Sequence, residues 1–467
     1  MRAPLRSTSR SLARVLAPAL GCVAAVSASA CVGELRGSDP PDAARADLDA
    51  PGLDAPGLDA PGLDASRADA PLPDAPGLDA PFPTSDDAGT DALFAGTDVG
   101  PPPPFDAGPC GTGGLAARLS VTPAAGVSAR GPLFGAPMPG GGASAAYEGG
   151  GGITIQRLAG DGAPFGGPVT VDGNGLYGFD ASADGYGVIV ARGSDALYLV
   201  GTSHDGAPRF SQRLLGEVPH DVTNNEWFGA LIRYGRLHYV ERDAEWAAYY
   251  TVNRLWPDGI AHYGDQLRTF GPDGAPRDTR WDWGCSHSME VRLEDNGSTL
   301  GPVCASDCYP SKGVHFDHRG ARLYTDEAGS NCAGGYGTSL GGVVPMADGF
   351  WVTFTATDMR ASHDVALVHV GNDRSAGAPI WLTTDAVRDT DVHAARYGAG
   401  FVVAWSADGT DRIARFDAAG AMVEGPLDLP GADLGSASDF FVLEGGDVGW
   451  IAAPGGTLAL ARLRVCE

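Results

Sequence analysis

Short apolar runs of strand length alternate with glycine- and aspartate-rich turns from residue 110 to the end of the chain. Several runs join a glycine to aromatic or aliphatic residues, as in "DGYGVIVAR" at 184–192, "DGFWVTFTA" at 348–356 and "GAGFVVAWS" at 398–406. Long helical runs rich in Ala, Leu, Glu and Lys are missing. This pattern predicts an all-β fold with many short strands.

A turn containing Gly-Ala repeats between the runs and reads Asp-Gly-Ala-Pro at 161–164, 205–208 and 273–276. The Gly-Ala pairs begin at Gly162, Gly206, Gly274, Gly320, Gly377 and Gly420. Their intervals are 44, 68, 46, 57 and 43 residues, so the unit is about 44 residues long and carries two insertions. Four short strands in a unit of this length are typical of one blade of a β-propeller.

The last unit is incomplete, because it begins near Ala437 and ends at "GGTLALARLRVCE" before such a turn appears. The segment "LAARLSV" at 115–121 can supply the missing strand. Pairing the first strand with the last blade would remove sheet edges that otherwise invite aggregation. Six turns and this seventh unit predict a propeller of seven blades over residues 110–467, with six blades as the competing count.

Composition and charge exclude one class of partner. The 467-residue chain has 69 Gly and 35 Pro, which agrees with many turns, and its net charge is −26. Lys312 is the only lysine, and no cluster of Lys or Arg exists outside the extreme N-terminus. Because binding to phosphates needs such clusters, nucleic acid is not expected as a partner.

Residues 1–30 have the three parts of a secretory signal peptide. Four arginines without an acidic residue occupy 1–14, an apolar stretch fills 15–26, and "SASAC" ends at Cys31. The apolar stretch is too short for a stable membrane span. The site resembles a bacterial lipobox, so Cys31 is the predicted lipidation site. "ALGC", which ends at Cys22, is a second candidate, and secretion without a lipid is the alternative.

Residues 31–109 are predicted to form a disordered acidic linker. From Asp39 to Pro109 the segment is almost entirely Asp, Ala, Pro, Gly and Leu, with 15 Asp and 2 Arg. It has too few large apolar residues to offset the entropy of ordering. Calcium binding would need closely alternating carboxylates, whereas the "PGLDA" unit spaces them apart. We therefore interpret the linker as a tether.

Cysteines in the predicted propeller form an even set, which in an exported protein predicts disulfides. They are Cys110, Cys285, Cys304, Cys308, Cys332 and Cys466. Cys110 and Cys466 flank the two strands predicted to close the ring, so we expect them to pair. The other four allow three pairings, and zinc ligation by this group is an alternative.

Polar residues stand at the predicted starts of several blades. If these positions face a central channel, converging His and Asp side chains could bind a small polar ligand or a divalent metal. The sequence predicts no cofactor. The alternative to a ligand or metal site is that these polar residues only line a channel mouth filled with solvent. The candidate residues are His220, Asp221, His287, Ser288, His393, Asp391, Asp180 and Asp439.

An insertion at 241–266 gathers aromatic residues in what the pattern predicts to be a loop. These residues, with one histidine, are Trp246, Tyr249, Tyr250, Trp256, His262 and Tyr263. Exposed rings near carboxylates would suit a carbohydrate or a peptide, by stacking and hydrogen bonding. The alternative is that the insertion folds back and buries the rings as a local core.

Familiar catalytic and nucleotide-binding motifs are absent, including G-x-S-x-G, H-E-x-x-H, the P-loop and the dinucleotide fingerprint. With its lipobox-like Cys31 and its repeat, the chain resembles bacterial surface lipoproteins that carry a divergent β-propeller. The resemblance implies export and anchoring of the chain to the outer membrane, because Val32 rather than Asp follows the cysteine.

These observations leave two hypotheses about function. The first is a noncatalytic binding or scaffold module for a glycan, a peptide or a surface protein. The alternative is a hydrolase or lyase that acts on a polymer and uses His and Asp residues of the channel. Convergence of those side chains in one pocket would favour the enzyme.

Overall fold

The computed structural model describes the chain from residue 113 onward, and all described residues belong to one compact unit, Gly89–Glu467. The described ranges are 113–193, 196–215, 226–227 (backbone only), 234–255, 261–286, 290–317, 321–326, 337–357 and 362–466. The predicted signal peptide, Cys31 and the acidic linker lie outside these ranges.

Each repeat forms an antiparallel sheet whose four strands pair in chain order. In the second blade they are β6 (Gly175–Ser182), β7 (Gly185–Arg192), β8 (Ala196–Thr202) and β9 (Pro208–Leu215). Residues 185–191 of β7 are all buried, whereas β9 is largely exposed at its start. A middle strand that is covered on both faces needs a continuous apolar run, which explains the pattern in the sequence.

Five further blades follow the same plan. The first blade contains β2 (Arg130–Pro137), β3 (Ala143–Gly149), β4 (Gly152–Leu158) and β5 (Val169–Val171). The third contains β11 (Gly235–Val240), β12 (Glu245–Leu255), β13 (Ala261–Phe270) and β14 (Pro276–Trp281), and the short β10 (Glu226–Trp227) pairs with the far end of β12. The fourth contains β15 (Glu290–Asp295), β16 (Leu300–Ser306), β17 (Gly313–Phe316) and β18 (Ala321–Thr325). The fifth contains β19 (Thr338–Met346), β20 (Gly349–Ala356), β21 (Asp364–Gly371) and β22 (Ile380–Trp381), and the sixth contains β23 (Asp389–Tyr397), β24 (Gly400–Ala407), β25 (Thr410–Phe416) and β26 (Met422–Asp428).

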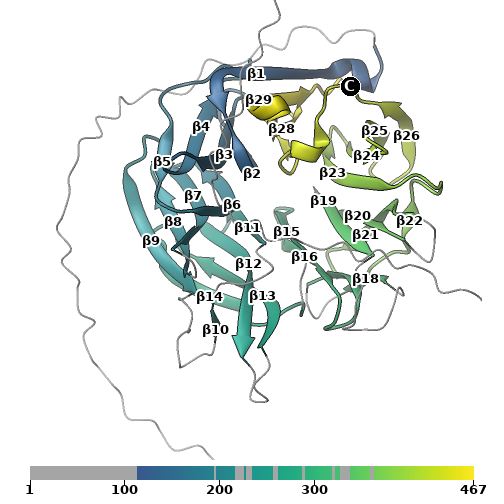
Figure 1. Ribbon diagram of the computed structural model, residues 1–467. Coiled ribbons are helices and arrows are strands. Elements are labelled where there is room, and N and C mark those ends of the chain that lie inside the picture. Colours follow the sequence, from purple (N-terminus) through teal and green to yellow (C-terminus); the bar gives the residue numbers. More distant parts are fainter. Residues whose placement is uncertain are drawn as a thin grey trace, which may run out of the picture. The chain divides into compact units, whose positions relative to one another are not determined.

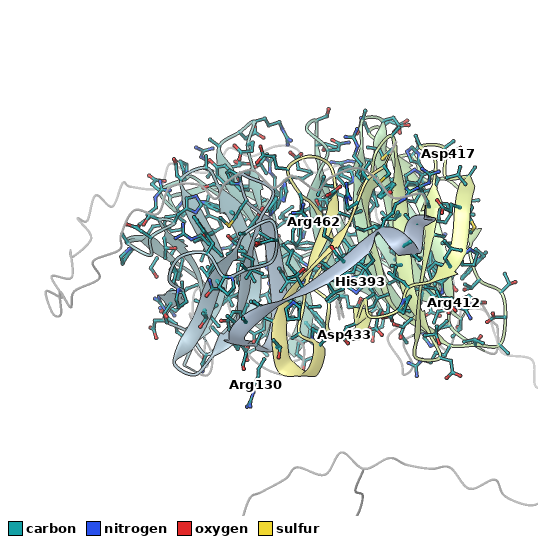
Figure 2. The ribbon with its side chains drawn as sticks, turned by 90° about the horizontal axis from the view of Figure 1, so that it is seen from above. Arg130, His393, Arg412, Asp417, Asp433 and Arg462 are labelled. Atoms are coloured by element: carbon teal, nitrogen blue, oxygen red, sulfur yellow. A yellow bond between two sulfur atoms is a disulfide. The ribbon has the colours of Figure 1, made fainter. Side chains whose placement is uncertain are left out.

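The seventh blade combines the two ends of the propeller. Its inner strands are β27 (Phe441–Val442), β28 (Val448–Ala452) and β29 (Thr457–Leu463), and its outer strand is β1 (Leu119–Ser128). Leu119 pairs with Leu463, so the predicted closure by the N-terminal strand is confirmed, as is the count of seven blades. Figure 1 shows β1 beside β29, and Figure 2 shows β1 crossing the last blade.

Helical structure in the described residues is limited to three short 3-10 turns. These are η1 (Leu115–Arg118), η2 (Leu434–Ser436) and η3 (Pro454–Gly456). Within the part of the chain that the structure describes, no helix has the length and apolar character needed to cross a membrane.

The first strands of the seven blades form a closed inner ring, because each contacts the first strand of the next blade. Figure 1 shows this arrangement of blades around a common axis. The apolar core lies between neighbouring blades. Between the fourth and fifth blades, for example, Phe316 packs against Phe350 with ring centroids 5.4 Å apart.

The repeated Gly-Ala turns join the third and fourth strands of their blades. Gly162 and Gly420 have φ angles of 80° and 81°, a left-handed conformation that favours glycine. The preceding Asp161 and Asp417 each accept a hydrogen bond from a backbone N–H two residues on, at 3.0 Å. This is how aspartate stabilises a turn, so the repeated motif has a direct physical cause.

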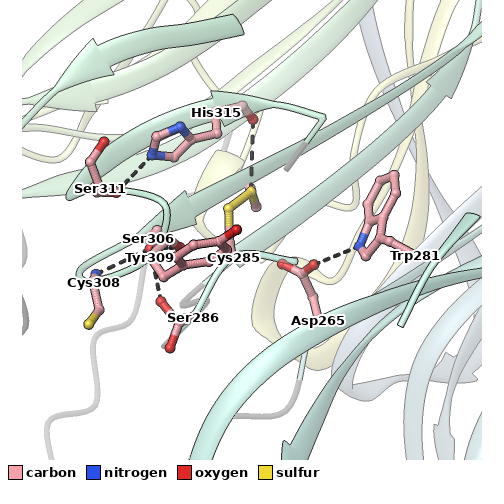
Figure 3. Close-up of a disulfide and its surroundings, with 10 residues drawn as sticks. Asp265, Trp281, Cys285, Ser286, Ser306, Cys308, Tyr309, Ser311 and His315 are labelled. Carbon is pink, nitrogen blue, oxygen red and sulfur yellow. Dashed lines mark hydrogen bonds between the residues drawn. A yellow bond between two sulfur atoms is a disulfide. The ribbon is translucent and has the colours of Figure 1, made fainter. Parts of the chain in front are cut away.

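A disulfide joins Cys285, which follows β14, to Cys304 on β16, with the Cα atoms 6.4 Å apart (Figure 3). This is one of the pairings that the sequence left open, and it excludes zinc ligation by these two sulfurs. Cys308 and Cys466 are also disulfide-bonded. Cys110 and Cys332 lie outside the described residues, so the predicted pairing of Cys110 with Cys466 stays a prediction.

Candidate functional site

The predicted site residues fall into three groups. His220, Asp221, Trp256 and His287 lie outside the described residues. Trp246, Tyr249 and His262 lie on the long strand pair of the third blade, and His393 lies on β23 of the sixth. The packing of each described residue shows whether its side chain can reach a ligand.

The expectation of an exposed aromatic loop does not hold for Trp246 and Tyr249, whose exposed fractions are 2% and 1%. Both lie on β12, which extends the third blade instead of leaving it. Trp246 packs on Tyr239 at 4.7 Å, and Tyr249 meets the edge of Trp281 at 5.5 Å. Alternate residues of β12 face the second and the fourth blade, so both of its faces are buried. These rings stabilise the core and cannot stack on a ligand at the surface.

His262, the histidine of the same insertion, lies opposite Arg254 in the β12–β13 pair and is half-buried. His393 is buried, and its Nδ1, which has no hydrogen-bond partner among the described residues, is not accessible from the surface. Its Nε2 donates to the carbonyl of Leu434 at 3.3 Å, and its ring stacks on Phe440 with an angle of 14°. Burial lowers the pKa of His393. The residue is therefore a neutral histidine of the core.

Charged side chains from distant blades do meet at the axis. Arg236 on β11 places Nε 2.6 Å from one carboxylate oxygen of Asp439, and Arg292 on β15 places Nε 3.5 Å from the other. Asp439 precedes β27 of the seventh blade. The third and seventh blades are not neighbours, so this contact crosses the channel. Burial alone would raise the pKa of Asp439, but the two arginines outweigh it and hold that pKa well below its usual range.

A second polar group lies along the same inner strands. Asp180 on β6 accepts a hydrogen bond from the backbone N–H of Tyr239 at 2.8 Å and lies 3.3 Å from Nδ1 of His238. Burial opposes the charged imidazole, yet Asp180 and nearby Glu294 outweigh it and raise the pKa of His238 to about 9. Burial raises the pKa of Glu294 to about 8, so its carboxyl group is mainly protonated at neutral pH.

The space beside these groups is small. A cavity of about 10 Å³ is lined by Arg292, Glu294, Asp439 and Phe440, among others. That volume corresponds to a single water molecule. At this level the channel therefore has room for about one water molecule and not for an organic ligand. Its paired charges join the blades.

A much larger pocket, of about 500 Å³, opens between the third and fourth blades. We call it the interblade pocket and define it by its lining residues, Arg242, Asp243, Leu267, Arg280, Trp281, Ser298, Thr299, Leu300, Pro302, Asp317 and Arg374. The third blade supplies the first five, the fourth supplies the next five, and Arg374 comes from the β21–β22 turn of the fifth. Its volume lies in the range of small-molecule binding sites.

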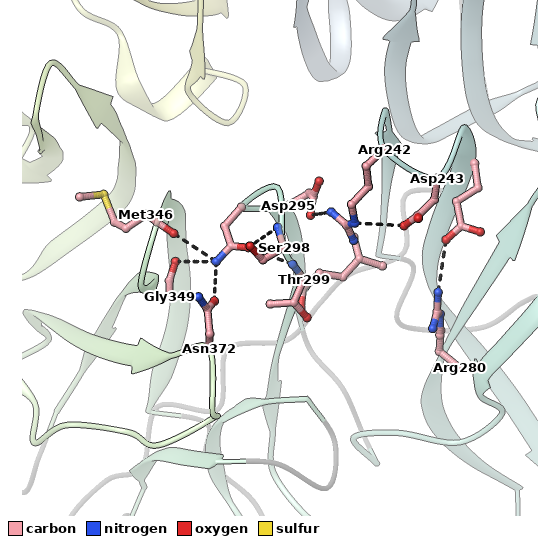
Figure 4. A network of polar contacts seen from close by, with 12 residues as sticks. Arg242, Asp243, Arg280, Asp295, Ser298, Thr299, Met346, Gly349 and Asn372 are labelled. Atoms are coloured by element: carbon pink, nitrogen blue, oxygen red, sulfur yellow. Dashed lines mark hydrogen bonds and ion pairs between the residues drawn. The ribbon is translucent and has the colours of Figure 1, made fainter.

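Each arginine of the interblade pocket is paired with a carboxylate. Arg242 pairs with Asp295 of the next blade, and its Nε lies 3.1 Å from Asp243 (Figure 4). Arg374 places Nη1 2.8 Å from Asp317. Pairing orients the guanidinium groups across the boundary between blades.

The remaining guanidinium of the pocket belongs to Arg280, whose Nη2 lies 3.3 Å from Glu245 and whose Nε lies 3.5 Å from Asp278. Glu245 is almost fully buried, so this pair fixes Arg280 against the third blade. All three arginines of the pocket are thus held by partners within the protein.

Asn296 fixes the opposite wall of the pocket. Its Oδ1 accepts hydrogen bonds from the backbone N–H groups of Ser298 and Thr299 at 3.0 and 2.9 Å. Its Nδ2 donates to the carbonyl of Met346 at 3.1 Å and to Oδ1 of Asn372 at 2.7 Å, both in the fifth blade (Figure 4). The turn that carries the two hydroxyl groups is therefore held in one position.

Metal binding finds little support among the described residues. The one group with suitable spacing is Asp265, Cys285 and Cys304. Its two sulfurs are bonded to each other, and a disulfide sulfur is not the thiolate that binds a metal. The divalent metal that the sequence allowed as an alternative stays a prediction for residues outside the described ranges.

Six four-stranded blades and one five-stranded blade, closed by the first strand, define the chain as a divergent seven-bladed β-propeller. No known protein family matches it, and no curated protein matches it either. Several solved structures are similar. A streptogramin B lyase shares 12% identity over 74% of this chain and 97% of its own, with a TM-score of 0.44.

Two other solved structures have comparable values. The Dos1 propeller shares 13% identity over 70% of this chain and 77% of its own, with a TM-score of 0.41. The α-L-arabinanase of Penicillium chrysogenum, complexed with arabinobiose, shares 11% identity over 74% and 96%, with a TM-score of 0.40. These similarities concern the fold alone.

Proposed function

We propose that the chain is an exported, lipid-anchored surface protein whose propeller is a noncatalytic binding module. The signal-peptide pattern, the lipobox-like Cys31 and the acidic tether support the location. The ligand, from the classes of glycan, peptide or surface protein, would occupy the interblade pocket.

One observation carries the binding role, namely the contrast in volume between the two polar regions. The channel cavity of about 10 Å³ has room for only about one water molecule, whereas the interblade pocket of about 500 Å³ is large enough for an organic ligand. Its arginines are held in place by ion pairs, so little side-chain entropy is lost when a ligand binds.

The enzyme alternative has one observation in its favour. Glu294 has a pKa raised to about 8, which suits a general acid near neutral pH. Its cavity, however, lacks room for a polymer substrate. We therefore favour binding without catalysis, and this predicts that the ligand is recovered unchanged after incubation with the protein.

The binding role is tested with the full chain on arrays of immobilised glycans and peptides, beside two matched variants. Arg374→Gln removes a pocket guanidinium that is 59% exposed, and Arg412→Gln removes one on β25 that is likewise paired with a single aspartate. We expect Arg374→Gln to weaken binding at least tenfold and Arg412→Gln to leave it unchanged. Equal binding by all three proteins, or none by the folded wild type, would contradict the proposal.

A further inference from the structure

The balance of charges in the interblade pocket restricts the chemistry of its ligand. Arg242, Arg280 and Arg374 line the pocket, and every one of them faces at least one carboxylate within 4 Å. An anionic ligand would have to approach those carboxylates. A cationic ligand would have to approach three guanidinium groups. A neutral ligand avoids both repulsions.

The ion pairs leave hydrogen-bonding capacity on the arginines. A guanidinium has five N–H donors. Within the described residues, Nη2 of Arg242, Nη1 of Arg280 and both Nε and Nη2 of Arg374 take no part in an ion pair. The Ser298 hydroxyl adds a group that both donates and accepts. The Thr299 hydroxyl donates to the carbonyl of Leu300 at 3.4 Å, so it adds an acceptor. The pocket thus offers fixed donors beside carboxylate and hydroxyl acceptors.

Apolar groups complete the lining. Leu267, Trp281, Leu300 and Pro302 also border the pocket. A ligand that suits this lining carries hydroxyl groups on its edges and C–H groups on its faces. A peptide offers one N–H and one C=O per residue and would leave more of the side-chain donors unpaired.

We infer that the interblade pocket binds a neutral carbohydrate, a short oligosaccharide or the end of a glycan chain, with Arg242, Arg280 and Arg374 as donors and Asp243 and Asp317 as acceptors. This inference rests on the proposed binding function and specifies its ligand class. Because the ligand is uncharged, affinity should depend little on ionic strength.

The test measures binding to the full chain by titration calorimetry with four classes of probe of similar length. The first class is neutral trisaccharides, of glucose and of mannose. The others are tri-galacturonate, a chitosan trimer and uncharged tripeptides. We expect a neutral trisaccharide to bind best, with less than a twofold change in Kd between 50 and 500 mM NaCl. Arg374→Gln should weaken this binding at least tenfold.

A second pair of variants adds a charge instead of removing one. Ser298→Asp places a carboxylate on the exposed wall of the pocket, and Thr410→Asp places one at the exposed start of β25 as the control. We expect Ser298→Asp to weaken binding of the neutral trisaccharide several-fold and Thr410→Asp to leave it unchanged. Both substitutions are at exposed positions, so we expect both variants to fold.

The outcomes separate the inference from the proposed function. Preferential binding of tri-galacturonate, of the chitosan trimer or of tripeptides at the interblade pocket would overturn the carbohydrate inference and leave the binding function standing. Binding of a neutral trisaccharide that neither Arg374→Gln nor Ser298→Asp affects would also overturn the inference, because the site would lie elsewhere. If the folded chain bound none of these probes and nothing on the glycan and peptide arrays, both the carbohydrate inference and the proposed binding function would be overturned.

Discussion

The central channel and the interblade pocket are built from the same chemistry, arginines paired with carboxylates, yet they leave very different spaces. At the axis, Arg236 and Arg292 share Asp439 beside a cavity of about 10 Å³. At the boundary of the third and fourth blades, each arginine has its own partners around about 500 Å³. The same kind of ion pair can therefore line a channel with almost no free space and also line a pocket large enough for a ligand.

The difference follows from distance to the axis. The first strands of the blades contact one another in a ring, so side chains there meet even across non-adjacent blades. Farther out, neighbouring blades diverge (Figure 1), and the interblade pocket opens between the third and the fourth. Exposure changes accordingly, since the side chain of Arg374 is far more exposed than that of Arg236 or Arg292. Mutations at the axis should alter stability, and mutations in the pocket should alter binding.

The largest effect on stability is expected at the shared carboxylate of the channel. Asp439→Asn leaves two largely buried arginines without a charged partner. Removing one partner of a fully buried ion pair costs about 3–5 kcal/mol, and since the side chain of Asp439 is 33% exposed we expect about 2 kcal/mol. Urea denaturation followed by tryptophan fluorescence measures this loss. An unchanged midpoint, relative to the exposed control Asp408→Asn, would show that the channel pairs do not hold the blades together.

A smaller loss of stability is expected when the pH is raised, because Glu294 and His238 of the channel have raised pKa values. The folded state keeps protons on Glu294 up to about pH 8 and on His238 up to about pH 9, whereas the unfolded chain releases them near pH 4.5 and 6.5. Stability is therefore lost as pH rises through these windows. The urea midpoint should fall between pH 6 and pH 9.

The variant Glu294→Gln isolates one of the two groups. Glutamine has no ionisable carboxyl group, so the loss of a proton from residue 294 no longer destabilises the folded state. The urea midpoint should therefore fall less steeply between pH 6 and pH 8 than in the wild type. Binding at the interblade pocket should be unaffected. A wild-type midpoint that stays level or rises toward pH 9 would contradict this account of the channel.

The smallest effect on stability is expected in the pocket. Arg374→Gln breaks an ion pair with Asp317. The side chain of Asp317 is 12% exposed, but that of Arg374 is 59% exposed, so we expect a loss of about 1 kcal/mol. The urea midpoint should therefore stay close to that of the wild type, while ligand binding weakens at least tenfold. A stability loss as large as that of Asp439→Asn would remove the distinction between the two regions.

Much of the fold could be predicted from local patterns. Turns such as Asp161–Ala163 repeat because aspartate and glycine stabilise them through bonds within a few residues. Closure by the first strand followed from counting strands per unit. These features depend on short-range chemistry and on the number of strands, both of which a single sequence contains.

The site was harder to predict, because its contacts join distant segments. Asp180 and Asp439 were expected at the axis, and they do take part in its contacts. Their partners Arg236 and His238 were missed, since nothing in a sequence shows that residues 203 positions apart, as Arg236 and Asp439 are, or 58 positions apart, as His238 and Asp180 are, will face each other. Trp246 was misplaced for a related reason, because burial of both faces of β12 depends on the blades on either side.

The pairing of β1 with β29 also fixes the order of events during synthesis. The first strand of the propeller cannot find its partner until residues 457–463 have been made. Until then β1 has an unpaired edge, and such edges pair readily with other chains. A chain that stops before residue 457 would keep six complete blades and still lack the means to close. Residues 457–463 therefore decide whether β1, more than 300 residues earlier, finds its place in the propeller.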